Sequence, residues 1–254
     1  MQPFMRHLLI ALLFISCNNL SKNNKLNAQR NNVATYDTVT MMSYNVISKP
    51  ALFETAFFKG TEVKEDTVSI KFYSISIGKI DVQSGSLIAS EPWWMYDKRP
   101  FTTKFPVGQF PVQLAIAKIN QNRIVAFSRI LFSDNPVDHW EFALKEGQKQ
   151  MSIFGDTIYS YSVDRGIGGF VDESSYNNFQ AVEKPLQSQV MDSLSKELER
   201  KQNLYANVSK RRVNIVAFSS GLGDGRYATY IGFDKSGNPC RLLTDFDLID
   251  WRKK

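Results

Sequence analysis

Three aspartates beside glycines are the residues of this sequence whose types and spacing best suit chemistry. Asp164 and Asp172 stand on either side of a glycine-rich bend in SVDRGIGGFVDE, and Asp224 lies in SGLGDGRY. If these carboxylates share one rim, they can ligate a divalent cation or raise one another's pKa for acid–base hydrolysis. The alternative is that each accepts hydrogen bonds from the backbone amides of its own turn, as aspartate commonly does beside glycine.

The segment around Asp224 does not match a phosphate-binding loop. It lacks the GxxxxGK[ST] pattern, and the strand-like RYATYIGF follows it where a phosphate loop has a helix. We therefore expect a connection between two strands. Asp164, Arg165, Asp224 and Arg226 then either line a shallow ligand site or only stabilise the turns.

Apart from these aspartates, His139 is a candidate catalytic base, and the alternative is a surface or packed strand residue. The histidines are His7 and His139, and the cysteines are Cys17 and Cys240, without a CxxC or HExxH pattern. We therefore predict no zinc site and assign no catalytic residue. If Asp138 and His139 both belong to a strand, they point to opposite faces and cannot act as a pair.

A cluster of aromatic residues lies in EPWWMYDKRPF. Adjacent Trp93 and Trp94 project to opposite faces if this segment is extended, so one indole is exposed unless another element covers it. Exposed indoles serve protein, glycan or membrane interfaces. Trp93, Trp94 and Tyr96 are therefore candidate recognition residues, and the alternative is that they cover the sheet.

The first residues read as an export signal. Arg6 and His7 precede a short apolar run, which is much shorter than the roughly 20 residues that a membrane-spanning helix needs. The segment FISC resembles the lipobox of bacterial lipoproteins, which predicts a signal peptide over 1–16 and lipidation of Cys17. An ordinary secretory signal is the alternative. The asparagine-rich stretch that follows predicts a flexible tether over 17–38.

This N-terminus predicts a protein that is exported and lipid-anchored in the bacterial cell envelope. By resemblance to the sorting of such lipoproteins, Asn18 in place of aspartate favours the outer membrane over the inner membrane. If Cys17 is lipidated, Cys240 has no partner for a disulfide, so the core must be stable without a cross-link.

The charge of the chain argues against nucleic acid as a partner. The formal net charge is +6 at pH 7, and most basic residues are interleaved with acids. Only the runs at 210–212 and 252–254 form basic clusters. Binding of nucleic acid usually needs a basic stripe or an aromatic stacking platform, and the sequence shows neither.

Alternating apolar residues predict a mainly β (α+β) fold over a single domain at 39–254. Candidate strands are 67–77, 86–89, 110–119, 123–132, 138–144, 157–164, 169–172, 213–219, 226–233 and 240–245. Apolar spacings of three and four predict one amphipathic helix over 185–203, packed on the sheet. The segment 52–58 fits a short helix or a strand equally well. We expect an antiparallel β sandwich or a partly open barrel.

Several of these segments together resemble the bacterial domain-of-unknown-function 4241 (DUF4241) family. They are IGKIDVQSGSLIASEPWWMYDKRPF, FPVGQFPVQLAIAKI, RIVAFSRILFSDNPVDHWEFAL, SVDRGIGGFVDE and VNIVAFSSGLGDGRYATYIGFDKSGNPCRLLTDF. The resemblance covers roughly 77–246. The chain departs from the family at Glu91, where aspartate is expected before proline, and at Gly169, where cysteine is common. The resemblance implies no activity.

Two classes of function follow. The first is a non-catalytic binding or interaction module, anchored by lipid, with a protein or glycan partner and no cofactor. The alternative is a hydrolase that uses the three glycine-flanked aspartates, with a divalent cation as its cofactor.

Overall fold

The computed structural model describes residues 50–65, 67–93 and 98–252. Its elements, in chain order, are α2 (Leu52–Thr55), β1 (Glu62–Glu65), β2 (Val68–Val82), β3 (Leu87–Ser90), β4 (Gly108–Ile119), β5 (Asn122–Leu131), β6 (His139–Phe142), β7 (Tyr161–Val163), β8 (Ile167–Asp172), α3 (Glu173–Ala181), α4 (Lys184–Arg200), β9 (Tyr205–Lys210), β10 (Val213–Ser219), β11 (Gly225–Phe233) and β12 (Pro239–Asp245).

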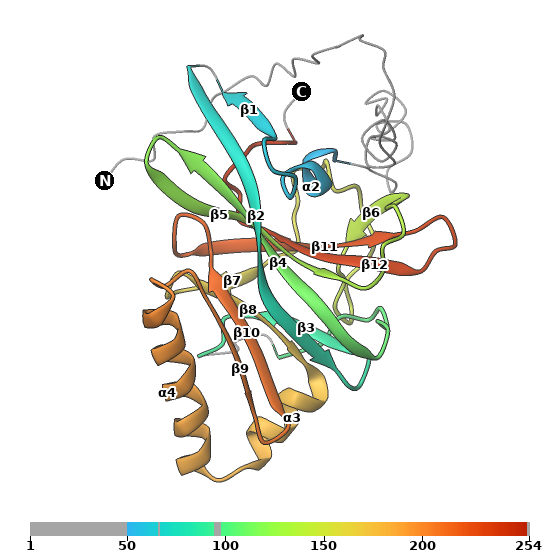
Figure 1. Ribbon diagram of the computed structural model, residues 1–254. Coiled ribbons are helices and arrows are strands. Elements are labelled where there is room, and N and C mark those ends of the chain that lie inside the picture. Colours follow the sequence, from blue (N-terminus) through green and yellow to red (C-terminus); the bar gives the residue numbers. More distant parts are fainter. Residues whose placement is uncertain (1–49, 66, 94–97, 253–254) are drawn as a thin grey trace, which may run out of the picture.

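The strands form two antiparallel sheets, which confirms the predicted fold class. The larger sheet has the order β1-β2-β4-β5-β12-β11-β6, and β7 also pairs with β11. The smaller sheet has the order β3-β8-β10-β9. In Figure 1, β2 runs along most of the molecule, while β11 and β12 cross it near the middle.

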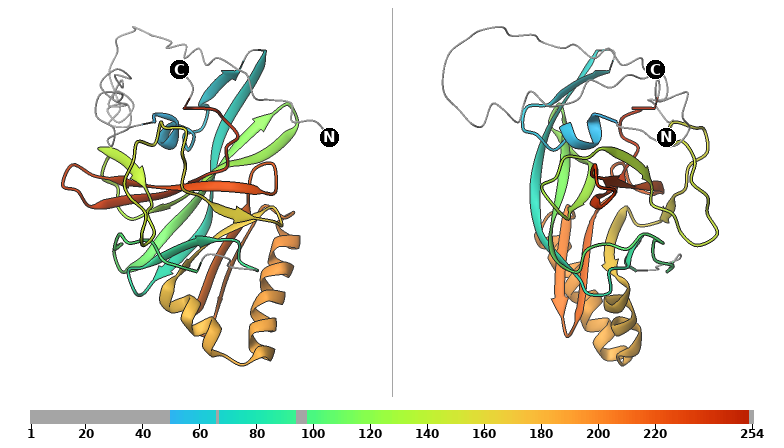
Figure 2. Two further views of the ribbon diagram at one scale, coloured as in Figure 1. Left: turned by 180° about the vertical axis from the view of Figure 1, so that it is seen from behind. Right: turned by 90° about the vertical axis from the view of Figure 1, so that its right-hand side faces the viewer.

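Three hydrophobic clusters hold these layers together. One lies between the two sheets and contains Leu114, Phe170 and Phe218. A second covers the other face of the larger sheet, where Phe53 of α2 packs among aromatic rings. The third lies between the smaller sheet and the helices α3 and α4, which Figure 2 shows at one end of the molecule. Burial of apolar surface in three successive layers therefore stabilises a fold that has no disulfide among its described residues.

The predicted amphipathic helix is α4. Pro185 stands in its first turn, and Val190, Leu194 and Leu198 are its buried residues. The helix α3 was not predicted, because its sequence ESSYNNFQA is largely polar. The charged β1 and the polar β9 were also missed. The undecided segment at 52–58 begins with the short helix α2.

Two asparagines connect the sheets at a bulge in β2, between Ser76 and Lys79. The side-chain amide of Asn207 donates to the carbonyls of Ile77 and Lys79, at 3.2 and 2.9 Å. Asn214 donates to the side chain of Asn207 and accepts from the backbone of Asp81. These bonds tie β9 and β10 of the smaller sheet to backbone groups of β2 at the bulge and just beyond it.

Among the described residues, no helix combines the length and the apolar character that crossing a membrane requires.

Candidate functional site: two glycine loops side by side

The structure places the two glycine-rich loops of the sequence next to each other. β7 pairs with the start of β11, so the loop after Val163 lies beside the loop before Gly225. The Gly166 amide donates to the Asp224 carboxylate at 2.8 Å. The Gly166 carbonyl accepts from the Ser220 amide at 2.9 Å. The loops therefore form one connected surface.

Glycine is required in these loops for two reasons. Gly166, Gly221 and Gly223 all have positive φ, at 64°, 64° and 117°. Gly221 also lies against Phe246, and a Cβ atom at position 221 would be 2.9 Å from the Phe246 Cβ. The loop conformation is thus set by close packing as well as by turn geometry.

Two hydroxyl groups fix the loop at 220–224 from within. The Ser220 and Tyr227 hydroxyls donate to the Gly223 carbonyl, at 2.8 and 2.6 Å. Burial raises the pKa of Tyr227, so its hydroxyl keeps its proton and remains a donor. The backbone beneath the exposed side chains is therefore well held.

The exposed side chains here are Asp164, Arg165, Leu222, Asp224 and Arg226, and we call them the loop-pair rim. Leu222 is 74% exposed at the tip of its loop. Arg226 donates to the Ser160 hydroxyl at 3.3 Å. The rim thus combines two acids and two bases with one exposed leucine. Sequence reasoning missed Leu222, although an apolar residue between two turn glycines was a usable signal.

Asp172 has a different role from the rim aspartates. It is fully buried and caps α3, where one carboxylate oxygen accepts from Ser174. The other oxygen accepts from the amides of Gln83 and Ser84 and from the Ser84 hydroxyl, at 2.9 to 3.1 Å. Five hydrogen bonds satisfy this carboxylate, so Asp172 fixes the turn before β3 and the start of α3.

Glu91 lies beneath the rim and was not predicted as a site residue. It is fully buried, and its Oε2 accepts from the Asp164 amide at 2.6 Å. Its Oε1 is buried without a hydrogen-bond partner. Burial raises the pKa of Glu91, although the hydrogen bond from Asp164 opposes that change. Glu91 therefore supports the first loop from inside the protein.

Of the predicted aromatic residues, Trp93 is described, whereas Trp94 and Tyr96 lie outside the described residues, as does Cys17. Trp93 is partly buried and packs against the cluster below α3 and α4. The Arg165 guanidinium lies 6.0 Å from the centre of its ring. Trp93 thus covers the smaller sheet and also borders the rim.

A small cavity lies at the other end of β7. Its volume is about 20 Å³, and Lys145, Tyr161, Tyr227 and Thr229 are among the residues that line it. Room of this size holds about one water molecule, which is too little for an organic substrate. The Tyr161 hydroxyl is buried without a hydrogen-bond partner, and burial raises its pKa.

His139 lies close to two carboxylates, contrary to the expectation that Asp138 and His139 point to opposite faces of one strand. Its Nδ1 is 3.2 Å from Asp138, and its Nε2 is 3.6 Å from Glu141. The expectation was wrong because β6 begins at His139, so Asp138 precedes the strand and its side chain can turn toward the ring. The ring also stacks on Phe233. Within the described ranges, no group of three or more histidines, cysteines and acids is arranged to hold a metal ion.

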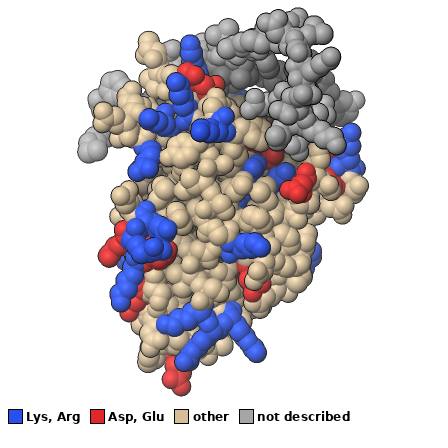
Figure 3. All heavy atoms as spheres, in the orientation of Figure 1, with Lys and Arg blue, Asp and Glu red and all other residues tan. Residues whose placement is uncertain are grey.

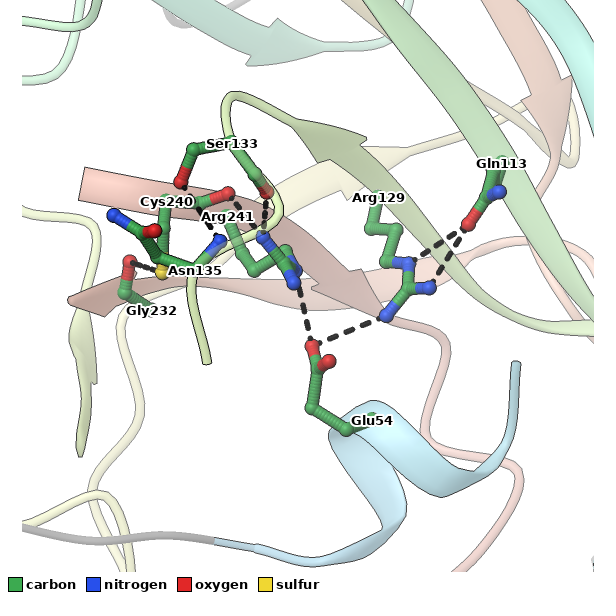
Figure 4. A network of polar contacts seen from close by, with 8 residues as sticks. All are labelled: Glu54, Gln113, Arg129, Ser133, Asn135, Gly232, Cys240 and Arg241. Carbon is green, nitrogen blue, oxygen red and sulfur yellow. Dashed lines mark hydrogen bonds and ion pairs between the residues drawn. The ribbon is translucent and has the colours of Figure 1, made fainter. Parts of the chain in front are cut away.

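A second cluster of arginines and an acid is buried under α2 (Figure 4). Glu54 accepts from Arg129 on β5 at 3.1 Å and from Arg241 on β12 at 3.3 Å. Arg129 also donates to Gln113, and Arg241 donates to the carbonyls of Ser133 and Cys240. Burial lowers the pKa of Arg129 to about 10, and Arg241 adds to this effect. These contacts join α2 to three strands.

One of three comparisons with known proteins, the comparison with family models, agrees with the family resemblance of the sequence. Comparisons with curated proteins and with solved structures returned no match. A family model described as "Protein of unknown function (DUF4241)" matches residues 80–244, which include both glycine loops. The chain therefore belongs to the DUF4241 family.

Proposed function

We propose that this protein is a non-catalytic binding module, anchored in the bacterial cell envelope through a lipid on Cys17, and that the loop-pair rim binds a protein. The observation that carries the proposal is the exposure of Leu222 on a loop with a fixed backbone. An apolar residue surrounded by charged groups of both signs resembles the centre and rim of a protein interface.

Two features make the rim ready to bind. Hydrogen bonds from Ser220 and Tyr227 hold the loop, so little backbone entropy is lost when a partner docks. Charges of both signs favour a partner with complementary charges and disfavour others. A protein fits better than a glycan, because Trp93 is partly covered and leaves less of its ring for stacking on a sugar.

The hydrolase alternative required Asp164, Asp172 and Asp224 to act on one substrate or one cation. The Asp172 carboxylate is instead buried and bonded to Gln83, Ser84 and Ser174. This set of three is therefore not the basis of the proposal.

Photo-crosslinking in cells tests the rim. A photoreactive amino acid replaces Leu222 in one strain and Lys235, which is exposed in the turn between β11 and β12, in a control strain. We expect one adduct from position 222 that contains peptides of a second protein by mass spectrometry and that disappears when Arg165→Ala and Arg226→Ala are added. Equal adducts from both positions would contradict the proposal. An adduct whose added mass is removed by glycan-degrading enzymes, and that contains no peptides of a second protein, would identify a glycan partner instead.

The anchor is tested by Cys17→Ser. We expect this variant to lose incorporation of labelled fatty acid and to leave the membrane fraction, because acyl chains contribute about 0.8 kcal/mol per buried methylene. Unchanged fractionation would contradict lipid anchoring at Cys17. Separation of inner and outer membranes then tests the expected location in the outer membrane.

A further inference from the structure

The turn between β9 and β10 places two arginines in an unfavourable backbone conformation. Lys210 pairs with Val213, so Arg211 and Arg212 alone form the turn. Their φ angles are 48° and 65°. Two consecutive residues with positive φ define a type I′ turn, in which Asn-Gly is strongly preferred because other side chains are strained there.

A comparable two-residue hairpin turn, between β4 and β5, follows the usual preference. Ile119 pairs with Asn122, and the residue with positive φ is Asn120, at 55°. Asparagine tolerates this conformation well. The arginines of the β9–β10 turn are therefore not explained by turn formation, and backbone strain of this kind suggests a function for the side chains.

Contacts from α3 hold the strained turn in place. The Ser175 hydroxyl and the Asn178 amide donate to the Arg212 carbonyl, at 3.3 and 3.2 Å. Ser175 is fully buried and also accepts from the Asn214 amide at 2.7 Å. The turn is thus fixed to the body of the molecule, and the two arginines project from a rigid support.

The charged groups of this turn have no acidic partner among the residues that the structure describes. Arg211 and Arg212 are exposed, and neither guanidinium makes a hydrogen bond or ion pair with the described residues. Lys210 contacts the Gln189 side chain at 3.4 Å. We call Lys210, Arg211 and Arg212 the basic tip. Figure 3 shows basic side chains gathered at the lower end of the molecule, where Figure 1 places this hairpin beside α3.

We propose that the basic tip binds the phosphate groups of an anionic phospholipid surface. Guanidinium groups form paired hydrogen bonds to phosphate oxygens, and a rigid support lowers the entropy lost on binding. Three adjacent cations suit a surface with many phosphates better than a single buried anion. Nucleic acid is a weaker candidate, because its binding usually needs a longer basic stripe or a stacking platform.

Vesicle sedimentation tests the proposal with a chain from residue 17 onward that carries Cys17→Ser, so that no acyl chain contributes. The protein with the unchanged basic tip should bind vesicles that contain phosphatidylglycerol and should not bind vesicles of phosphatidylcholine alone. Each basic residue near an anionic surface contributes about 1 kcal/mol. The double variant Arg211→Asn/Arg212→Gly should therefore bind about 30-fold more weakly.

The same variant should fold better, because Asn-Gly suits the turn. We expect its melting temperature to rise by about 2–4 °C. A loss of binding together with a gain in stability cannot come from misfolding. The matched control is Lys118→Ser/Arg123→Ser, which removes two positive charges from residues that pair with each other next to the β4–β5 turn. This control should change vesicle binding by less than about threefold.

Several results would overturn the proposal. They are the absence of binding to phosphatidylglycerol vesicles, equal binding by the wild type and the turn variant, or an equal loss in the control variant. Calorimetric titration with inorganic phosphate separates the two sources of phosphate. Binding of free phosphate at micromolar concentration, without binding to vesicles, would assign the tip to a soluble ligand and reject the lipid surface. The Asp224→Ala variant should bind vesicles normally, since the rim is a separate site.

Discussion

Two clusters of arginines and acids in this protein have similar composition and opposite surroundings. In the buried cluster under α2, the side chains of Arg129 and Arg241 are each 8% exposed, and both contact Glu54. In the loop-pair rim, Asp164 and Arg226 are exposed, and the hydrogen bonds hold mainly the backbone. The comparison shows that burial and fixed partners, and not residue type, separate charges that stabilise the fold from charges that can meet a partner.

Glu54→Gln tests the buried side of this comparison and should have the largest effect. It leaves Arg129 and Arg241 close together in a buried site without a carboxylate, and breaking a buried ion pair costs about 3–5 kcal/mol. Because Glu54 is 28% exposed, we expect a loss of about 3 kcal/mol in urea denaturation. Glu141→Gln is the control, and similar losses in both variants would remove the distinction.

Asp245 tests how burial changes the titration of an acid. Burial raises its pKa from 3.8 to about 6, although Arg252 and the Trp251 indole N–H oppose this change. The folded protein therefore holds this proton more tightly than the unfolded chain does. Protonated Asp245 therefore stabilises the folded state relative to the unfolded chain. This contribution is fully present below about pH 4 and is lost as pH rises through 6.

Comparison with Asp245→Asn isolates this effect. Relative to the variant, the wild type should lose about 2–3 kcal/mol of unfolding free energy between pH 4 and 7, measured by urea denaturation at each pH. The rim variant Asp224→Asn serves as the exposed counterpart and should show a much flatter difference. Parallel curves for wild type and Asp245→Asn would contradict the shifted pKa.

Gly221→Ala tests the packing that supports the rim. The new Cβ would meet Phe246 at 2.9 Å, and the residue would keep a positive φ. We expect a loss of about 2 kcal/mol in thermal or urea denaturation. Gly223→Ala is the matched variant, because it has positive φ but no atom within 4 Å of the new Cβ. Its loss should be about 1 kcal/mol, and equal losses would mean that packing against Phe246 is unimportant.

Substitutions of side chains in the loop-pair rim should have the smallest effect on the stability of the fold. Asp224→Ala removes one exposed hydrogen bond to the Gly166 amide, so we expect a loss below about 1 kcal/mol. Arg226→Ala should change stability by less than about 0.5 kcal/mol. Both changes should reduce crosslinking from position 222. A large loss of stability with normal crosslinking would reverse the comparison and make the rim part of the fold.

Local patterns predicted much of the fold. Alternation indicated the strands from β4 to β6 and from β10 to β12, and apolar spacing indicated α4. Polar composition hid β9 and α3, since YANVSK forms a strand through pairing with β10 and ESSYNNFQA forms a helix after the Asp172 cap. In these elements tertiary packing outweighs intrinsic propensity.

The candidate site was predictable only in part. The glycine and aspartate spacings identified both loops, but their contact depends on pairing between Tyr161–Val163 and the start of β11, far along the chain. Asp172 followed by Ser174 was a recognisable cap signal. The burial of Glu91 beneath Asp164 depends on the path of the chain after β3, which no local pattern reports.

The asparagine contacts at the β2 bulge also bear on how the protein unfolds. β2 pairs with β1 and β4 of the larger sheet and contacts β8, β9 and β10 of the smaller one. Separating the sheets would break the bonds of Asn207 and expose the cluster that both sheets share. We therefore expect the described strands to unfold cooperatively, with amides of β2 and β10 among the slowest to exchange with deuterium.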